Sequence, residues 1–329
     1  MARYYRADWQ RNHAVSTEIT GYAVSALVYL HSVTHDSRYL ERAVTAARFL
    51  TWTAWDAGRR TMPFELAPSA FTYFFDCGII ARGLLAAWRA TAEQEFLDVA
   101  AALGQTMAAD FASQDGDFHP ILSLPDKAPA ERDAGRWSRM PGCYQLKSAM
   151  AWWELFEATG DPRFSEPYER VLEYSLGSYA AFLPGDTDRL KVMDRLHAFC
   201  YFLEGMLPRS GDPACAAAIR DGLGRAAQLL REIAPQFERS DVYAQILRMR
   251  LYADWAGAAP LDCEAASFEA ERLEGFQAAD GDPRIDGGYY FGRKGGAWLP
   301  HVNPVSSAFA SQALELWRGR AQAPIHLLI

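Results

Sequence analysis

Apolar stretches of helix length alternate along the chain with shorter, more polar ones. In "STEITGYAVSALVYLH" (residues 16–31) every residue from Ala23 to Leu30 is uncharged, which predicts a helix that is buried on all sides. The stretch after the next turn, "DSRYLERAVTAARFL" (36–50), mixes apolar and charged residues and predicts a helix with one exposed face. The chain therefore begins with a hairpin of one buried and one amphipathic helix.

The same hairpin pattern recurs along the sequence. The turn segments "YLHSVTHDSRYLERA", "AWRATAEQEFLDVA", "LFEATGDPRFSEPY" and "MLPRSGDPACAAAI" align on Thr34, Thr91, Thr159 and Ser210, and weaker copies read "LYADWAGAAPLDCEAA" and "LELWRGRA". Sixteen residues before each anchor, the first turn of a buried helix is expected at Glu18, Phe75, Cys143, Asp194, Val242 and Pro304. Six helical hairpins are thus predicted.

Six hairpins that each pair an apolar with an amphipathic helix are expected to form an all-α (α/α)6 toroid, a single domain over residues 1–329 with the apolar helices inside. A helical solenoid is the alternative, but it needs polar capping repeats, and the first predicted helix is as apolar as the middle ones. In a toroid the six inner helices begin at the same end and frame a funnel. The glycine- and aromatic-rich segment 284–304 predicts a β-hairpin over its mouth.

Composition restricts the function classes. The 329 residues are half hydrophobic and carry a net charge of −8, which argues against general binding to nucleic acid or to anionic membranes. Five cysteines without CxxC spacing predict packed, reduced thiols and neither disulfides nor a metal site. No signal peptide or membrane span is recognised, so a cytoplasmic location is expected. No cofactor or metal is expected, and the sequence does not indicate the oligomeric state.

Polar groups recur at the predicted starts of the buried helices. Glu18 is the clearest example of a polar group that needs an explanation, because burying a carboxylate is costly unless it is paired or faces a cavity that contains water. A carboxylate there can also simply cap backbone N–H groups, as Asp76, Asp194 and Asp241 could too. Carboxylates, phenols, imidazoles and an amine at all six starts are better explained by a ligand site, whose candidate residues are Glu18, Tyr22, Asp76, Tyr144, Lys147, Asp194, His197, Tyr201, Asp241, Tyr243, His301 and Asn303.

Aromatic residues of the connecting loops add flat apolar faces, which suit the C–H faces of sugar rings as well as they suit the rim of a core. Among them, Tyr289 and Trp298 in the predicted β-hairpin segment are expected to contact a saccharide. A saccharide is therefore the expected partner.

The hairpin repeat, with "STEITGY", "FFDCGIIARGLLAAW", "GCYQLKSAMAWWELFEATGDPRF" and "LPHVNPVSSAFASQALELW", resembles the six-hairpin glycosidase superfamily and bacterial toroid proteins of polysaccharide metabolism. That superfamily includes unsaturated glucuronyl hydrolases, enzymes of the N-acylglucosamine 2-epimerase type and the helical domain of glucuronyl C5-epimerases. Neither the aspartate-centred motif of the hydrolases nor the paired-histidine pattern of the 2-epimerases is found. The resemblance therefore implies the fold and a saccharide substrate more than a reaction.

Three functions are compatible with these residues. The first is a glycoside hydrolase in which Glu18 and Asp76 act as acid and base opposite His197, with Asp194 and Asp241 as alternatives. The second is a uronic acid C5-epimerase or lyase, in which a tyrosine or His197 removes a proton and Lys147 neutralises the acid. The third is a non-catalytic saccharide-binding protein of a polysaccharide assembly system.

Overall fold

The computed structural model describes residues 1–66, 68, 70–234 and 236–329. The chain divides into two compact units. The first unit consists of Met1, Ala14–Gly177 and Ile325–Ile329, and the second of Ala2–His13 and Ser178–Pro324.

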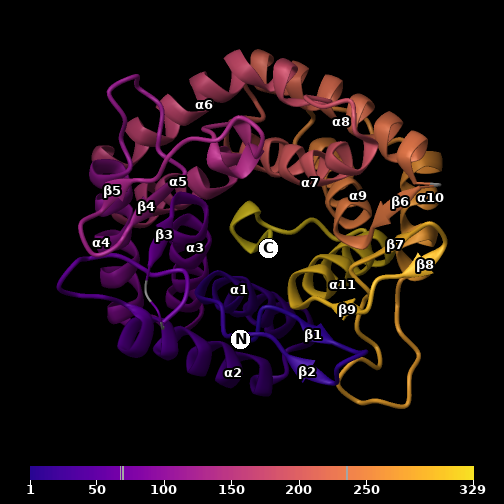
Figure 1. Ribbon diagram of the computed structural model, residues 1–329, viewed down its shortest axis with the longest axis horizontal. Helices are drawn as coiled ribbons and strands as arrows, with labels where there is room; N and C mark the ends of the chain where they lie inside the picture. Colours follow the sequence, from indigo (N-terminus) through magenta and orange to yellow (C-terminus); the bar gives the residue numbers. More distant parts are fainter. Residues whose placement is uncertain (67, 69, 235) are drawn as a thin grey trace. The chain divides into compact units, whose positions relative to one another are not determined.

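The first unit is built from helical hairpins. Its helices are α1 (Thr17–Thr34), α2 (Ser37–Phe49), α3 (Phe74–Thr91), α4 (Gln94–Asp110), α5 (Leu146–Thr159) and the larger part of α6 (Pro162–Phe182), with short turns η1 (Leu50–Ala54), η2 (Trp137–Arg139), η3 (Cys143–Gln145) and η5 (Ile325–Leu327). The strands β3 (Phe71–Tyr73), β4 (Ile121–Ser123) and β5 (Ala128–Pro129) form an antiparallel sheet in the order β3-β4-β5. Helix α3 lies between α1 and α5, and α2 and α4 lie alongside them (Figure 1).

Glycines allow the apolar helices of this unit to approach closely. A Cβ atom on Gly21 in α1 would lie 2.9 Å from Ile80 Cα in α3, and one on Gly78 would lie 2.5 Å from the Ser148 Cβ in α5. Real Cβ atoms do not approach that closely, so these backbones pack directly against one another. The apolar sequence of α1 and α3 is thus explained by contact with further helices on several sides.

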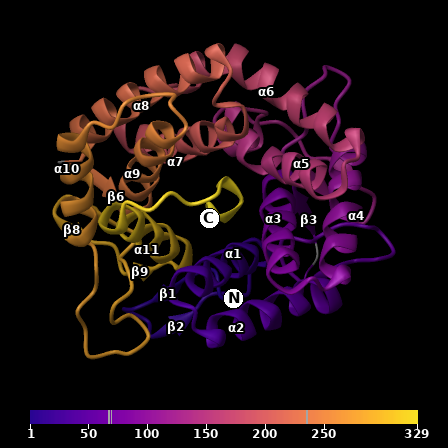
Figure 2. The same cartoon turned by 180° about the vertical axis from the view of Figure 1, so that it is seen from behind.

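The second unit contains α7 (Arg189–Gly205), α8 (Pro213–Ile233), α9 (Ser240–Trp255), α10 (Cys263–Glu274), α11 (Pro304–Gly319) and the turn η4 (Leu207–Arg209). Helix α9 lies between α7 and α11 in both views (Figures 1 and 2). The strands of the second unit are β1 (Tyr5–Arg6), β2 (Arg11–Asn12), β6 (Phe237–Arg239), β7 (Gly292–Lys294), β8 (Ala297–Trp298) and β9 (His301–Val302). They form two antiparallel sheets, with the strand orders β2-β1-β9 and β6-β7-β8.

Most predicted helix starts lie in the first turn of a helix or turn element. Glu18, Phe75, Val242 and Pro304 lie in the first turns of α1, α3, α9 and α11, and Cys143 begins η3 directly before α5. The prediction for α7 is wrong by more than a turn, because this helix already begins at Arg189, where Asp188 accepts a hydrogen bond from the Leu190 N–H. The predicted β-hairpin is confirmed as β7 and β8, joined through Gly295 and Gly296, both at positive φ.

The capping interpretation of the acidic residues is wrong for three of them. Asp76, Asp194 and Asp241 all lie inside their helices, whose N-cap residues are Tyr73, Asp188 and Arg239. Helix α1 is capped by Ser16, whose hydroxyl accepts from the Ile19 N–H, so Glu18 is not its N-cap residue either. By contrast, Asn303 does cap α11 and accepts from the Val305 N–H.

All five cysteines are free; Cys263 is exposed and the other four are buried. Within the described ranges, no helix has both the length and the apolar character that crossing a bilayer requires.

Candidate functional site

His197 is the centre of a polar cluster at the start of α9 in the second unit. Its Nδ1 atom lies 2.8 Å from Gln245 Oε1 and 3.5 Å from Asp241 Oδ2, and the edge of its ring meets the Tyr201 ring at 4.5 Å between centroids. Gln245 and Asp241 come from α9, four residues apart and therefore on one face of the helix. That face packs against α7, which carries His197 and Tyr201.

Arg239 holds the carboxylates of this cluster in place. It is the last residue of β6, directly before α9, and its Nε and Nη2 atoms donate to the two oxygens of Asp241 at 3.0 and 2.7 Å. Its Nη1 atom donates to Asp194 at 2.8 Å. Asp241 is almost fully buried, whereas half of the Asp194 side chain is exposed. We call Asp194, His197, Arg239, Asp241 and Gln245 the His197–Arg239 cluster.

The electrostatics of the cluster keep His197 neutral and Asp241 ionised. Burial lowers the pKa of His197 to about 4, although attraction to Asp241 partly opposes this. Burial alone would raise the pKa of Asp241, but Arg239, followed by His197, outweighs it and the pKa lies below its usual value. With a neutral imidazole, one guanidinium and two carboxylates, the cluster has a net charge of −1 at neutral pH.

Gln245 determines which nitrogen of His197 carries the proton. The Gln245 amide nitrogen donates to the backbone carbonyl of His197 at 3.5 Å, so its carbonyl oxygen faces Nδ1. A carbonyl oxygen accepts hydrogen bonds only, which places the proton on Nδ1. No described residue hydrogen-bonds to Nε2, and 15% of the side chain is exposed. The Nε2 atom of His197 is therefore unprotonated in this arrangement.

A second histidine, His301, is connected to the same arginine through the Phe291 ring. The Arg239 guanidinium lies 4.5 Å from the centre of the Phe291 ring, and that ring stacks on His301 at 6.1 Å. Backbone hydrogen bonds fix this arrangement, since Phe291 accepts from the Ser240 N–H and donates its own N–H to His301. His301 Nδ1 is buried and has no hydrogen-bond partner among the described residues. Burial, then nearby Arg6, lowers the pKa of His301.

The predicted carboxylate pair lies in the first unit. Glu18 is half-buried in the first turn of α1, and Asp76 is buried in the first turn of α3, which packs against α1. Whether the two act as acid and base, opposite His197, stays a prediction.

Several other candidates from the sequence are engaged elsewhere. Tyr22 is buried in α1. Tyr144 is buried with its hydroxyl donating to the Met140 carbonyl, and burial raises its pKa. Lys147 is completely buried and donates to the Ile329 carbonyl oxygen at 3.1 Å, so its ammonium presents no surface to a ligand.

The tyrosines of the second unit divide between two environments. Tyr201 contacts His197, whereas Tyr243 points to the opposite side of α9 and its hydroxyl donates to Glu238 at 3.2 Å. Tyr289 is buried, and its backbone N–H donates to Ser307 Oγ. Trp298 is 44% exposed and stacks on Tyr290. These positions separate Tyr243 from the His197–Arg239 cluster.

Sequence reasoning missed Arg239, Gln245 and Phe291. A signal for Arg239 was present, because "FERSDVY" places a cation two residues before Asp241 at a predicted helix start. Gln245 and Phe291 carry no such signal, since only the packing of α9 against α7 and the pairing of distant strands bring them to His197 and His301. In the part of the chain that the structure describes, no group of three or more histidine, cysteine, aspartate or glutamate residues is arranged to hold a metal ion.

Comparison of the sequence with known proteins finds no matching family and no matching curated protein. Comparison of the structure finds similar enzymes. A sugar epimerase from a ruminal bacterium, 12% identical, has a TM-score of 0.74 over 98% of this chain and 93% of that chain. A cellobiose 2-epimerase from Spirochaeta thermophila DSM 6192 is 15% identical, with a TM-score of 0.70 over 92% of this chain and 85% of that one.

A D-mannose isomerase is 9% identical, with a TM-score of 0.70 over 97% of this chain and 92% of that one. At such low identity these likenesses bear on the fold alone. They confirm the predicted fold class, a mostly helical (α/α)6 toroid.

Proposed function

We propose that this protein is a carbohydrate-active enzyme that moves a proton next to the carbonyl group of a neutral sugar, as an epimerase or isomerase. The observation that carries the proposal is a neutral His197 whose Nδ1 lies 2.8 Å from Gln245 Oε1 and 3.5 Å from the ionised Asp241, and whose Nε2 has no hydrogen-bond partner among the described residues. The enzymes of similar fold include ones described as sugar epimerases and as a D-mannose isomerase, which supports the same chemistry.

His197 supplies the base. A proton on the carbon next to a carbonyl is acidic enough to be removed by a positioned imidazole. As Nε2 takes that proton, the ring becomes positively charged 3.5 Å from Asp241. Asp241 is kept ionised by its two hydrogen bonds from Arg239, so its attraction offsets part of the cost of charging the buried ring.

His301 is the proposed partner that returns or takes a proton on the other face of the substrate. Inversion at a carbon requires a proton to leave from one face and arrive at the other, whereas an aldose–ketose isomerisation needs one base only. Arg239 contacts Asp241, which faces His197, and it also contacts the Phe291 ring, which stacks on His301. A role for both therefore favours epimerisation.

The charge of the cluster favours a neutral sugar over a uronic acid. Asp194 and Asp241 together outweigh Arg239, and Lys147 is buried against the Ile329 carbonyl. No cation of the cluster is left to neutralise a uronate. This is an argument against the C5-epimerase or lyase alternative.

A second candidate function is glycoside hydrolysis by Glu18 and Asp76. It is favoured by the position of both carboxylates in the first turns of two helices that pack together, with Asp76 buried. Burial raises the pKa of a carboxylic acid, and a raised pKa is what a general acid of a glycosidase requires.

The test is to incubate the protein with D-mannose, D-glucose, cellobiose, uronic acid oligosaccharides and neutral polysaccharides, and to identify the products by NMR. We expect an epimer or a ketose from a neutral reducing sugar. His197→Gln should lower kcat by about a thousandfold, and the matched control His31→Gln, a half-buried histidine of α1, should leave it unchanged. New reducing ends with activity retained in His197→Gln would support the hydrolase instead. Binding without turnover would support a saccharide-binding protein.

A further inference from the structure

The second unit contains a pocket on the opposite side of β6 from the His197–Arg239 cluster. Glu238 and Arg239 are neighbours on this strand and point to opposite faces, as successive strand residues do. Arg239 faces the cluster, and Glu238 faces a pocket of about 380 Å³. That volume lies in the range of small-molecule sites.

Three arginines surround the pocket and only one carboxylate lines it. Glu238 is almost fully buried and accepts hydrogen bonds from Arg272 at 2.6 Å and from the Nε atom of Arg293 at 2.8 Å. Arg293 is also its cross-strand partner in β7. The third cation, Arg231 of α8, is exposed and has no hydrogen-bond or ion-pair partner among the described residues. The lining therefore has a net charge of +2 in a chain whose net charge is −8.

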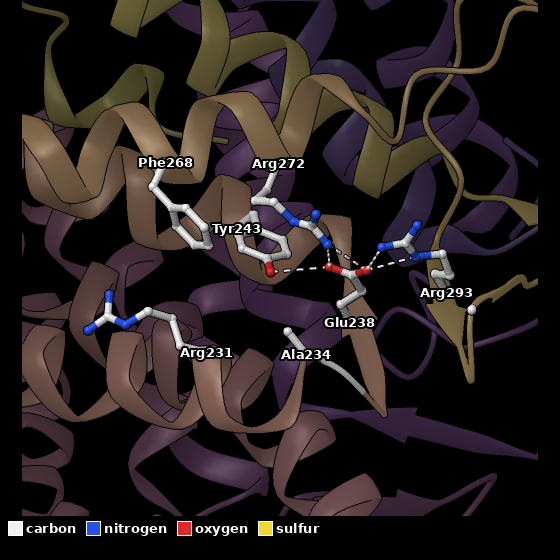
Figure 3. A pocket seen from close by; sticks show the side chains of 8 residues that line it. Arg231, Ala234, Glu238, Tyr243, Phe268, Arg272 and Arg293 are labelled. Carbon is white, nitrogen blue, oxygen red and sulfur yellow. Dashed lines mark hydrogen bonds and ion pairs between the residues drawn. The ribbon is translucent and has the colours of Figure 1, made fainter.

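Glu238 fixes two of the arginines without using all their donors. Arg272 reaches it through Nη2 alone, and Arg293 through Nε and Nη2. Since each guanidinium carries five N–H groups, both keep donors for a further acceptor. The Tyr243 hydroxyl also donates to Glu238, which leaves the carboxylate saturated and the guanidinium groups oriented (Figure 3).

An aromatic ring lines the same pocket. Phe268 is 40% exposed and meets the Tyr243 ring at 6.5 Å between centroids. It lies one helical turn before Arg272 on α10, on the same face. Figure 3 shows Phe268 and Arg231 on one side of the pocket and Glu238 with Arg293 on the other. A ligand in the pocket thus meets a flat apolar surface as well as guanidinium groups.

We propose that this pocket binds a phosphate monoester of a small sugar or polyol. The phosphate, a dianion at neutral pH, matches the net charge of +2, and its oxygens accept from the open donors of Arg272 and Arg293, with Arg231 closing from the other side. The organic part lies on the Phe268 ring. This binding site is separate from the His197–Arg239 cluster and does not depend on the reaction performed there.

The test is isothermal titration calorimetry of the full chain with glucose 1-phosphate, inorganic phosphate and glucose. We expect glucose 1-phosphate to bind more tightly than inorganic phosphate, and any binding of glucose to be the same in the parent protein and in Arg231→Ala. Arg231→Ala should weaken binding of glucose 1-phosphate at least tenfold. Because Arg231 is exposed and has no partner among the described residues, this variant should fold normally.

Two further variants separate the parts of the proposal. Phe268→Ala should weaken the binding of glucose 1-phosphate severalfold and leave the binding of inorganic phosphate unchanged. Arg42→Ala, which removes an exposed arginine of α2 without a described partner, is the charge control and should change neither. The proposal is overturned if the parent protein does not bind glucose 1-phosphate, if Arg231→Ala weakens binding of glucose as much as it weakens binding of glucose 1-phosphate, or if Arg231→Ala and Arg42→Ala behave alike.

Discussion

Glu154 and Asp241 are both buried carboxylates held by arginine, one in each unit, but Asp241 also lies 3.5 Å from the imidazole of the partly exposed His197. Glu154 is the ninth residue of α5, and its two oxygens accept from Arg82 and Arg89 of α3, each at 2.7 Å. Asp241 is the second residue of α9 and leads through Arg239 to the exposed Asp194. The same pair of residue types thus ties two helices together in one place and builds a candidate site in the other.

Position along the helix explains the difference. In the middle of an apolar helix a carboxylate is surrounded by other helices, so all its hydrogen-bonding capacity goes to neighbouring protein groups. The Arg82 Nη2 atom likewise donates a hydrogen bond to a protein group, the Leu328 carbonyl oxygen. At a helix start, by contrast, the carboxylate follows a loop or strand and is not surrounded by helices on all sides. The partly exposed His197 lies next to such a start, that of α9. A buried ion pair therefore indicates function only when its surroundings leave a reactive group accessible.

Replacing Glu154 should have the largest effect on stability. Glu154→Gln leaves Arg82 and Arg89 with no carboxylate between them in a buried position, which should lower the free energy of unfolding by about 3–5 kcal/mol. Urea denaturation measures this, and kcat of the folded protein should stay unchanged. The control is Glu157→Gln on the same helix, where the exposed Glu157 is 4.0 Å from Arg89. If both variants lose equal stability, the structural role assigned to Glu154 is wrong.

Replacing Asp241 should mainly affect turnover. Asp241→Asn removes the charge that stabilises protonated His197, so kcat should fall by about a hundredfold. Its control is Asp194→Asn, which removes an exposed carboxylate from the same arginine and should reduce kcat less than threefold. Steady-state kinetics at saturating sugar compares them, and equal effects would remove the special role of Asp241.

The pH dependence of kcat/KM should follow the lowered pKa of His197. The base must be unprotonated, so activity should remain constant from pH 7 down to about 5 and fall through an apparent pKa of about 4. Because Asp241 raises the pKa of His197, Asp241→Asn should move this acid limb to still lower pH. A limb near the ordinary histidine value of about 6.5 would contradict the burial of His197 in the active protein.

Replacing Gln245 should have a smaller effect than replacing Asp241. Gln245→Leu removes the acceptor that selects the Nδ1–H form of His197 but leaves Asp241 beside the same nitrogen. Loss of one such hydrogen bond is worth about 1 kcal/mol, which corresponds to a roughly fivefold lower kcat. A loss as large as that of Asp241→Asn would show that Gln245 and not Asp241 is the main partner of His197.

The sequence predicted the fold class well and the candidate site in part. The hairpin repeat arises from local alternation of apolar and polar helices, so Glu18, Phe75, Val242 and Pro304 fell in the first turns of helices. His197, Asp194 and Asp241 were named as candidates and lie together. The start of α7 was misplaced because polar residues such as Arg189 and Lys191 gave no apolar signal there.

Side-chain direction was the part that could not be predicted. Tyr243 is two residues from Asp241 on α9, yet it points toward Glu238 on the other side of the helix. The contact of Phe291 with both Arg239 and His301 depends on strand pairing over about 50 residues of chain, between β6 and β7. The buried position of Lys147 depends on the last residues of the first unit.

Hydrogen exchange with solvent tests the central claim, that His197 moves a proton on a neutral sugar, most directly. The protein is incubated in D2O with a reducing sugar that it converts, and deuterium at the carbon next to the carbonyl is followed by NMR. We expect deuterium to enter this carbon in the parent protein, and to enter it at least a hundredfold more slowly in His197→Gln, with His31→Gln unchanged. His301→Gln should still exchange deuterium but form the epimer more slowly. Conversion or cleavage of the sugar by the parent protein with no deuterium at that carbon would contradict the account.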